Sequence, residues 1–362
     1  MEARKSSHKI RRIVSIIAIF LVAFSVLSIV VTGILFNNNF GRNELNKNEI
    51  ALSYSDIDST AYPRNNIQFL SDDTTLQGYI YGATNTKGLI VVAHGIMSGA
   101  DSYLPEIMYF VDNGWCVFAF DGTGTRSSEG RGIRGLPQTK LDLIAALSYV
   151  NESPDLSELP IVLYGHSMGG YAVTAYLKDY SYDIRAVVCV SGFNSPLDTM
   201  YYQVESVVGF YANIEYPFIW LYQKFLFGKD ADVSAVDGIN SVDIPILFIY
   251  GTMDDVVPYD EIGIYAYKEQ ITNPNVSFLS VDEEGRNWHD NVHLSQEAGL
   301  YSQEIKNELS KLQEQNGGLL SNNDFMAFMK NIDQKSMNAL NSEYMHGLLE
   351  FMESAVTKAE VQ

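Results

Sequence analysis

One short stretch of the sequence restricts the fold more than any other. Residues 161–164 form an apolar run with the length of a buried strand, and the sequence G-H-S-M-G-G follows at residues 165–170. A helical pattern continues over residues 169–178. Glycines around Ser167 permit a turn sharp enough to push the serine hydroxyl out of the sheet. We therefore predict a strand, a tight turn and a helix, with Ser167 at the turn.

The chain from residue 67 onward alternates short apolar runs with helical patterns. Such alternation is typical of a mostly parallel sheet flanked by helices. The first two runs, at residues 67–70 and 77–81, are separated by turn-forming residues and are expected to pair as an antiparallel hairpin. Later strands are expected at residues 89–93, 116–120, 161–164, 186–190, 246–250 and 276–281, and helices at 137–150 and 169–178.

Two segments interrupt this alternation within the expected domain at residues 61–362. Residues 196–240 form a long insert between the sixth and seventh strands and are rich in aromatic side chains. Residues 295–358 have apolar side chains at helical spacing, with a break at Gly317-Gly318. We expect a helical insert from the first segment and carboxyl-terminal helices from the second.

The amino-terminal region has the composition of a membrane span. Residues 13–36 contain no charged side chain and are largely apolar. A helix of this length reaches about 36 Å, enough to cross a hydrocarbon core of about 30 Å with some tilt. Basic residues are concentrated in the tail at residues 1–12, whereas Arg42 is the nearby cation on the other side. The positive-inside bias predicts a cytoplasmic amino terminus and an extracytoplasmic domain.

A cleaved secretory signal is the alternative for this segment. The apolar region of a signal spans about 7–15 residues and ends in a small-x-small cleavage site. The run in this chain is longer, and its V-T-G at residues 31–33 matches such a site poorly, which favours a retained transmembrane helix. Both alternatives export the domain. Residues 37–60 are polar with little periodicity and are expected to form a linker.

The formal net charge of −20 argues against a nucleic-acid partner, because phosphate backbones are bound by clustered Lys and Arg. It also argues against binding of the folded domain to an anionic lipid surface. The two cysteines, Cys116 and Cys189, lie in apolar runs. They offer too few ligands at too wide a spacing for a metal site.

Three motifs in succession resemble those of α/β-hydrolases. His94-Gly95 follows one expected strand, Asp121 and Gly124 follow the next, and the G-H-S-M-G-G turn follows the one after that. The resemblance covers about residues 65–295 and is nearest to the lysophospholipase, monoacylglycerol-lipase and serine-aminopeptidase-like branch. It implies the α/β-hydrolase fold, with an eight-stranded, mostly parallel sheet in the order 1-2-4-3-5-6-7-8, flanking helices, and a helical lid formed by the insert.

The same resemblance implies where a developing oxyanion would be held. One donor in this family is a backbone N–H after His-Gly, which falls on Ile96, and the other belongs to the residue after the nucleophile, Met168. His94 would organise its loop rather than act as a base. The next loop departs from the family, since Thr123 and Arg126 stand where Arg and Gly are usual. This departure weakens any inference about the substrate and leaves the fold unaffected.

The acid of a Ser-Asp-His triad is expected after a later strand and before the histidine. The strand at residues 246–250 leads into G-T-M-D-D-V-V-P at residues 251–258, which resembles the family pattern G-x-x-D-x-x-V-P and selects Asp254. Such an acid holds the imidazole in the required tautomer and stabilises the imidazolium. Asp255 is the alternative.

The base is expected in the loop after the last strand, where two histidines lie four residues apart. His289 follows turn-forming residues in the loop, whereas His293 borders a helical pattern. A side chain that swings from a loop toward the nucleophile favours His289. His166 lies in the turn of the nucleophile itself and is a poor candidate for the base.

These residues imply a membrane-anchored serine hydrolase that cleaves carboxylic esters of the acyl or acyl-glycerol type through an acyl-enzyme. Neither a cofactor nor a metal is required. The expected partners are a small-molecule or lipid-like acyl substrate and, through the amino-terminal helix, a membrane. A peptidase or amidase with the same triad is one alternative, and a catalytically silent binding protein is another. The implied strand order separates Cys116 from Cys189 by about 14 Å, so both should be free thiols.

Overall fold

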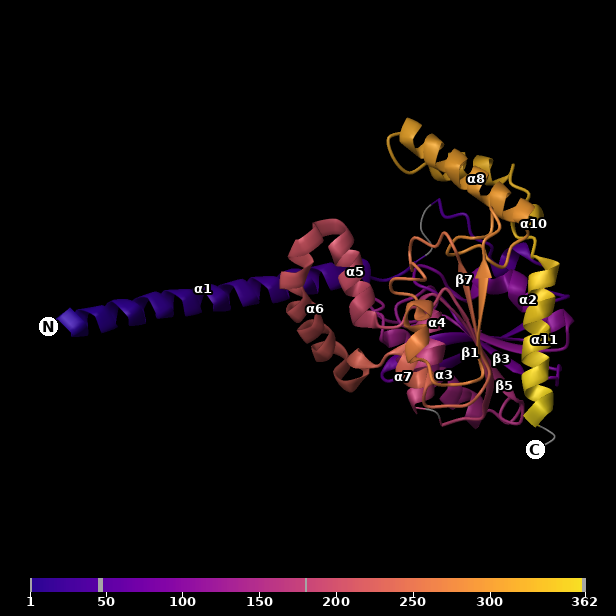
Figure 1. Ribbon diagram of the computed structural model, residues 1–362. Coiled ribbons are helices and arrows are strands. Elements are labelled where there is room, and N and C mark those ends of the chain that lie inside the picture. Colours follow the sequence, from indigo (N-terminus) through magenta and orange to yellow (C-terminus); the bar gives the residue numbers. More distant parts are fainter. Residues whose placement is uncertain (1, 45–47, 180, 360–362) are drawn as a thin grey trace.

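An eight-stranded sheet forms the centre of the molecule in the computed structural model, which describes residues 2–44, 48–179 and 181–359 (Figure 1). The strands lie in the order β1-β2-β4-β3-β5-β6-β7-β8. Their bounds are Arg64–Ser71, Thr74–Tyr81, Leu89–Ala93, Cys116–Phe120, Ile161–His166, Ile184–Val190, Ile246–Gly251 and Val276–Val281. β2 pairs antiparallel with β1 and β4, and the pairings from β4 through β8 are parallel. The predicted α/β-hydrolase sheet is therefore confirmed, with every expected strand present.

Helices cover both faces of the sheet because its central strands are apolar on both sides. β3 and β4 are buried along their whole length, as parallel strands between two helical layers must be. Leu143 of α3 and Val173 of α4 belong to the apolar cluster on one face, and Ile107 of α2 and Leu348 of α11 belong to the cluster on the other. These helices are α2 (Leu104–Asp112), α3 (Gln138–Glu152), α4 (Met168–Ala175) and α11 (Ser342–Ala359).

Both cysteines lie in the first of these two clusters. Cys116 is on β4 and Cys189 is on β6, and β3 and β5 lie between those strands. Each side chain is buried and each thiol is free. The expectation of two unpaired core cysteines is confirmed.

A single long helix, α1 (Glu2–Asn39), projects from the domain (Figure 1). Its segment His8–Asn39 is long and apolar enough to cross a membrane, judged by length and composition. Most of its apolar side chains are exposed. The second half of the helix crosses α6, which it contacts from Phe24 onward.

The segment after α1, expected as a linker, makes specific contacts with the domain. Arg42 donates hydrogen bonds to the backbone carbonyls of Arg126, Ser128 and Gly130. The backbone N–H of Asn43 donates to the carbonyl of Gly124. These contacts hold the end of α1 beside the loop that follows β4.

The insert between β6 and β7 is helical, as expected. It comprises α5 (Pro196–Val208), α6 (Ala212–Phe227) and α7 (Ala235–Ile239), joined by the 3-10 turns η4 (Gly209–Tyr211) and η5 (Gly228–Asp232). α5 and α6 form an arch on the side of the domain from which α1 projects (Figure 1). The carboxyl-terminal segment forms α8 (Gln296–Gln315), α9 (Asn322–Met329), α10 (Gln334–Met337) and then α11, which packs back onto the sheet.

Candidate active site

Ser167 occupies the turn between β5 and α4 in a strained backbone conformation. Its φ of 55° and ψ of −115° lie in a region that residues with side chains rarely adopt. The turn is possible because positions 165 and 169 are both glycine. A Cβ on Gly165 would overlap the carbonyl oxygen of Gly169, and a Cβ on Gly169 would overlap the carbonyl oxygen of Ala93. The local pattern of the sequence thus accounts for the conformation of this turn.

Two side chains from later loops meet beside this turn. Nδ1 of His289, in the loop after β8, lies 2.7 Å from Oδ2 of Asp254, in the loop after β7. Oδ1 of Asp254 accepts hydrogen bonds from the backbone N–H groups of Val256 at 3.0 Å and Val257 at 2.8 Å. Both side chains are buried. Asp254 is therefore held by backbone donors on one oxygen while its other oxygen orients His289.

The environment of His289 makes it a stronger base than a free imidazole. Burial opposes the charged form, but the hydrogen bond and the negative charge of Asp254 outweigh it and raise the pKa of His289. Because Asp254 accepts at Nδ1, the neutral ring carries its proton there. Nε2 is then free to accept a proton.

Asp255 and His293, the other candidates for the acid and the base, take no part in this contact. The side chain of Asp255 is exposed to solvent, and Asp254 takes the contact with His289. Nε2 of His293 lies 3.6 Å from Oε1 of the buried Glu106 on α2. The structure thus brings together Asp254 and His289, and it separates Asp255 and His293 from them.

The two expected oxyanion donors flank Ser167. Met168 is the first residue of α4, where the backbone N–H has no acceptor within the helix. Ile96 follows Gly95, which packs so closely that an added Cβ would lie 3.3 Å from Cβ of Ser167. The loop that carries Ile96 and the first turn of α4 therefore both lie next to Ser167.

A chain of hydrogen bonds that sequence reasoning missed joins this oxyanion loop to the loop of His289. The backbone N–H of Gly95 donates to the hydroxyl of Tyr103 at 2.9 Å, and that hydroxyl lies 2.9 Å from Nδ1 of His166. Nε2 of His166 donates to the backbone carbonyl of His289 at 3.0 Å. Burial, with His289 nearby, lowers the pKa of His166 to about 4, so this donor remains neutral at physiological pH.

Sequence reasoning had rejected His166 as a base, and its hydrogen bonds agree with that rejection. Both of its ring nitrogens are occupied by structural partners. The position of His166 next to Ser167 was the sequence signal for a role near the nucleophile. Its partner Tyr103 precedes α2 and is 63 residues away in the sequence, so the hydrogen bond between them could not be predicted.

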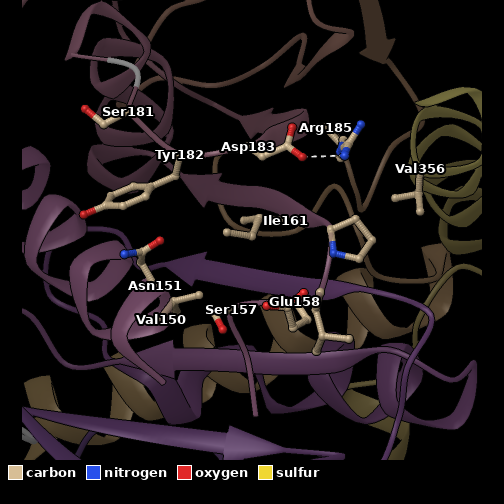
Figure 2. Close-up of a pocket in the computed structure, with 12 residues that line it drawn as sticks. Val150, Asn151, Ser157, Glu158, Ile161, Ser181, Tyr182, Asp183, Arg185 and Val356 are labelled. Carbon is tan, nitrogen blue, oxygen red and sulfur yellow. Dashed lines mark hydrogen bonds and ion pairs between the residues drawn. The ribbon is translucent and has the colours of Figure 1, made fainter. Parts of the chain in front are cut away.

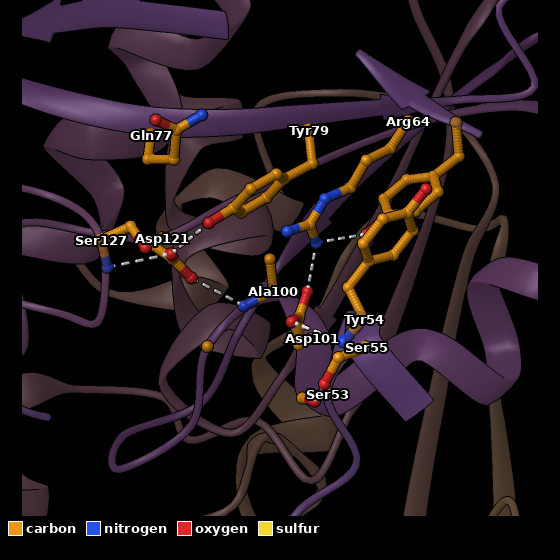
Figure 3. A network of polar contacts seen from close by, with 12 residues as sticks. Ser53, Tyr54, Ser55, Arg64, Gln77, Tyr79, Ala100, Asp101, Asp121 and Ser127 are labelled. Carbon is orange, nitrogen blue, oxygen red and sulfur yellow. Dashed lines mark hydrogen bonds and ion pairs between the residues drawn. The ribbon is translucent and has the colours of Figure 1, made fainter. Parts of the chain in front are cut away.

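His94 and Asp121 organise the loops that follow β3 and β4. Nε2 of His94 accepts from the backbone N–H of Gly122 at 2.9 Å. Asp121 accepts from the backbone N–H of Ala100 at 2.9 Å and from the hydroxyl of Tyr79 at 3.0 Å (Figure 3). These buried contacts explain the His-Gly and Asp motifs as supports of the loop that carries Ile96.

Arg64 strengthens the same support from β1. Its guanidinium lies between the rings of Tyr54 and Tyr79, 3.9 and 4.1 Å from their centres (Figure 3). It also donates to Oδ1 of Asp101 at 2.6 Å. The linker segment, through Tyr54, is thereby joined to the loop after β3.

Comparisons with known proteins agree with this fold. A family model described as "Serine aminopeptidase, S33" matches residues 84–219, which include Ser167. The esterase Pf2001 of Pyrococcus furiosus superposes with a TM-score of 0.51 at 18% identity, over 76% of this chain and 99% of the esterase. The monoacylglycerol lipase of Mycolicibacterium smegmatis is 32% identical over 29% of this chain and 38% of the lipase.

The chain has the α/β-hydrolase fold. It is also 29% identical to the uncharacterized protein YfhR of Escherichia coli O157:H7, over 52% of this chain and 62% of that protein. It therefore spans less than two thirds of the length of the curated relatives named here. The family model ends before Asp254 and His289, so the roles of these two residues depend on the geometry above.

A cavity of about 410 Å³ opens beside Ser167. Ser167, His289 and Ile96 line it together with residues from the linker segment and the carboxyl-terminal helices, such as Ile50 and Lys306. The sequence did not indicate that these two segments contribute walls. The insert lies instead on the Met168 side, where it packs against Met168 and Ile96 in an apolar cluster.

A second cavity, of about 460 Å³, lies at the opposite edge of the sheet (Figure 2). It is lined near the beginnings of β5 and β6 by Ile161, Tyr182 and Arg185, among others. Active sites of open α/β sheets lie at the carboxyl ends of the parallel strands, where Ser167 is found. We therefore assign no chemistry to this second cavity.

One group of side chains in the described part of the protein has donor atoms spaced for a metal ion, namely His166, His289 and Asp290. Both nitrogens of His166 already have hydrogen-bond partners, and Nδ1 of His289 is bound to Asp254. A single imidazole nitrogen and one carboxylate remain, which is a poor donor set for a resident metal.

Proposed function

We propose that the protein is a serine hydrolase that cleaves carboxylic esters of the acyl or acyl-glycerol type with a catalytic triad of Ser167, His289 and Asp254. The observation that carries this proposal is the 2.7 Å contact between Nδ1 of His289 and Asp254, in a cavity that both Ser167 and His289 line. Nucleophile, orienting acid and base then follow one another along the chain in the order usual for this fold.

The reaction would begin when Oγ of Ser167 attacks the ester carbonyl while Nε2 of His289 removes its proton. The carbonyl oxygen becomes an oxyanion that accepts hydrogen bonds from the backbone N–H groups of Met168 and Ile96. His289 then donates the proton to the leaving alkoxide, which leaves an acyl group on Ser167. Water, deprotonated by His289, attacks the acyl carbonyl and releases the acid and the free serine.

The apolar surroundings of Met168 support an acyl substrate. The insert places Leu197, Met200 and Tyr202 in the same apolar cluster as Met168 and Ile96. An acyl chain bound between the insert and the oxyanion donors would be covered by these side chains. The relatives described as an esterase and a monoacylglycerol lipase agree with this substrate class.

Amide or peptide hydrolysis is the second candidate, because the matching family model describes a serine aminopeptidase. The triad can attack either bond, so the leaving group decides between the two candidates. Hydrolysis of aminoacyl amides without hydrolysis of matched esters would favour this alternative.

We further propose that residues 13–36 form a transmembrane anchor, with a cytosolic tail at residues 1–12 and the domain at residues 61–362 outside the cytoplasm. The length and exposed apolar surface of α1 support the span, and the basic residues before it support the orientation. Residues 37–60 would connect the two.

Labelling with a fluorophosphonate, combined with a panel of matched esters and amides, tests the proposed chemistry. We expect the full-length protein to be labelled at Ser167 and to hydrolyse esters. Absence of labelling in correctly folded protein would contradict the triad. Labelling without ester hydrolysis would contradict the proposed substrate class alone.

A further inference from the structure

The outer surface of the insert is unusually apolar for a surface that faces water. At the turn between α5 and α6, Val207, Phe210 and Tyr211 are 82%, 78% and 70% exposed, and Phe225 near the end of α6 is 82% exposed. Large side chains of this kind, gathered at one place, mark an interaction surface.

Phe225 belongs to a set of four apolar side chains whose spacing places them on one face of α6. Ile214, Phe218, Leu221 and Phe225 recur at intervals of four, three and four residues, which places them along one stripe. The stripe contains no charged residue. The opposite face of α6 is buried against the domain, through Ala212, Ile219, Gln223 and Phe227. α6 thus has two apolar faces, one packed against the domain and one directed outward.

The anchor helix lies directly beside this stripe. One face of α1 is buried at intervals of four residues, at Ser28, Thr32 and Phe36. The rings of Phe24 and Phe218 also meet edge to face, with 5.9 Å between their centres. Oγ of Ser28 donates to Oε1 of Glu215 at 3.2 Å. The small side chains on this face let α1 and α6 approach closely.

The depth of this contact follows from the position of the basic residues. Arg12 is the last cation before the apolar run, and about 20 helical residues cross a hydrocarbon core of about 30 Å, so the core ends near residue 32. Phe24 and Ser28 therefore fall within the outer half of the bilayer. Because α6 packs on these residues, part of α6 must lie at the same depth.

We propose that the α5–α6 arch is inserted in the outer leaflet of the bilayer that α1 crosses, with the stripe from Ile214 to Phe225 covered by lipid acyl chains. This inference rests on the proposed anchor. Attraction would be apolar rather than electrostatic, since the protein carries a net charge of −20. α1 and the arch would together form one membrane-bound unit.

The position of the arch also identifies the source of the substrate. The inner side of the same insert packs on Met168 and Ile96, beside Ser167. An acyl ester dissolved in the outer leaflet could pass along the insert and reach the nucleophile without crossing water. The proposed site would therefore act on lipid-dissolved acyl esters.

Site-directed spin labelling of the full-length protein in phosphatidylcholine nanodiscs tests the insertion. Both native cysteines are buried, so a cysteine introduced as Phe210→Cys or Phe225→Cys takes the label selectively. We expect these labels to collide more often with oxygen than with a water-soluble nickel chelate. Leu319→Cys, between α8 and α9, and Met326→Cys, on α9, are matched controls at exposed apolar positions and should show the reverse.

The result separates the possible occupants of the stripe. Labels that the nickel chelate reaches freely would overturn the proposal, since the stripe would then face water. Spin–spin coupling between labels in two copies would also overturn it and would indicate a dimer. The measurement repeated in Ser167→Ala does not depend on turnover, so a failure of the proposed chemistry leaves this test intact.

A kinetic comparison tests the route of the substrate. The double variant Phe210→Ser/Phe225→Ser should hydrolyse a long-chain ester dissolved in the nanodisc about tenfold more slowly, because two large apolar side chains are lost from the proposed membrane contact. Hydrolysis of a short water-soluble ester should be unchanged, as should both rates in Leu319→Ser/Met326→Ser. Equal rates of the double variant and the native protein on the bilayer substrate would contradict the route.

Discussion

His166 donates a hydrogen bond from Nε2 to the backbone carbonyl of His289 at 3.0 Å. The residue before the candidate nucleophile thereby holds the loop of the candidate base. Tyr103 continues this link to Gly95 in the oxyanion loop. Three loops that are distant in sequence are thus held together around Ser167.

Tyr103→Phe should weaken this link while leaving every proposed catalytic group in place. The variant loses the hydroxyl that contacts both Gly95 and His166, and such a contact contributes on the order of 1 kcal/mol, so we expect kcat to fall about fivefold to tenfold. KM for a short ester and the pH profile should change little. Tyr109→Phe, on the helix α2 that begins directly after Tyr103, is the control. An unchanged kcat in Tyr103→Phe would show that the link does not position the base.

Ser167→Ala should abolish hydrolysis and preserve the fold. Loss of a nucleophile that acts in a triad costs on the order of 10⁴–10⁶ in kcat. Steady-state assays of the purified variant, with circular dichroism as a check on folding, measure both properties. Substantial turnover by the folded variant would require a different nucleophile.

Asp254→Asn should lower kcat by about 10⁴, because an amide no longer holds the imidazole in the productive tautomer. Asp255→Asn should have little effect, since that side chain faces solvent. The two variants differ by one position and carry the same chemical change, so each serves as the control of the other. The reverse order of effects would assign the acid to Asp255.

His289→Ala should approach the defect of Ser167→Ala, whereas His293→Ala should retain most activity. The contact of His293 with Glu106 lies away from Asp254, so its loss removes no proton acceptor from the proposed reaction. Comparison of kcat/KM for the two variants measures the difference. An inactive His293→Ala together with an active His289→Ala would move the base to position 293.

Activity should fall as the pH is lowered, because a protonated His289 cannot accept the proton of Ser167. Asp254 raises the pKa of His289, so the decline in kcat/KM should have its midpoint above the ordinary imidazole value of about 6.5. His166 should not contribute, since its pKa is lowered to about 4. A midpoint at or below about 6.5 would contradict the raised pKa.

Protease added outside intact cells should degrade the domain and leave a short membrane-bound stub that contains residues 13–36. Detection of this stub by mass spectrometry also distinguishes a retained anchor from a cleaved signal. Protection of the domain until the membrane is opened would show that the orientation is reversed.

The sequence by itself determined the features that depend on neighbours along the chain. The glycines around Ser167 specify the strained turn, and apolar runs such as residues 89–93 and 116–120 specify strands at their observed bounds. The sequence also limited the acid and the base to two candidate residues each. Strand ends and turn-forming residues show which loops lie at the carboxyl ends of the parallel strands, where such active sites are found.

Only the tertiary structure decided which side chains meet. Motif resemblance and loop context favoured Asp254 over Asp255 and His289 over His293, but the contact between the two favoured residues depends on how two loops pack. The contact of α1 with α6 is of the same kind, because side chains nearly 190 residues apart form it. Local spacing specifies turns, strands and helices, whereas contacts between distant segments arise only when the sheet brings their loops to a common edge.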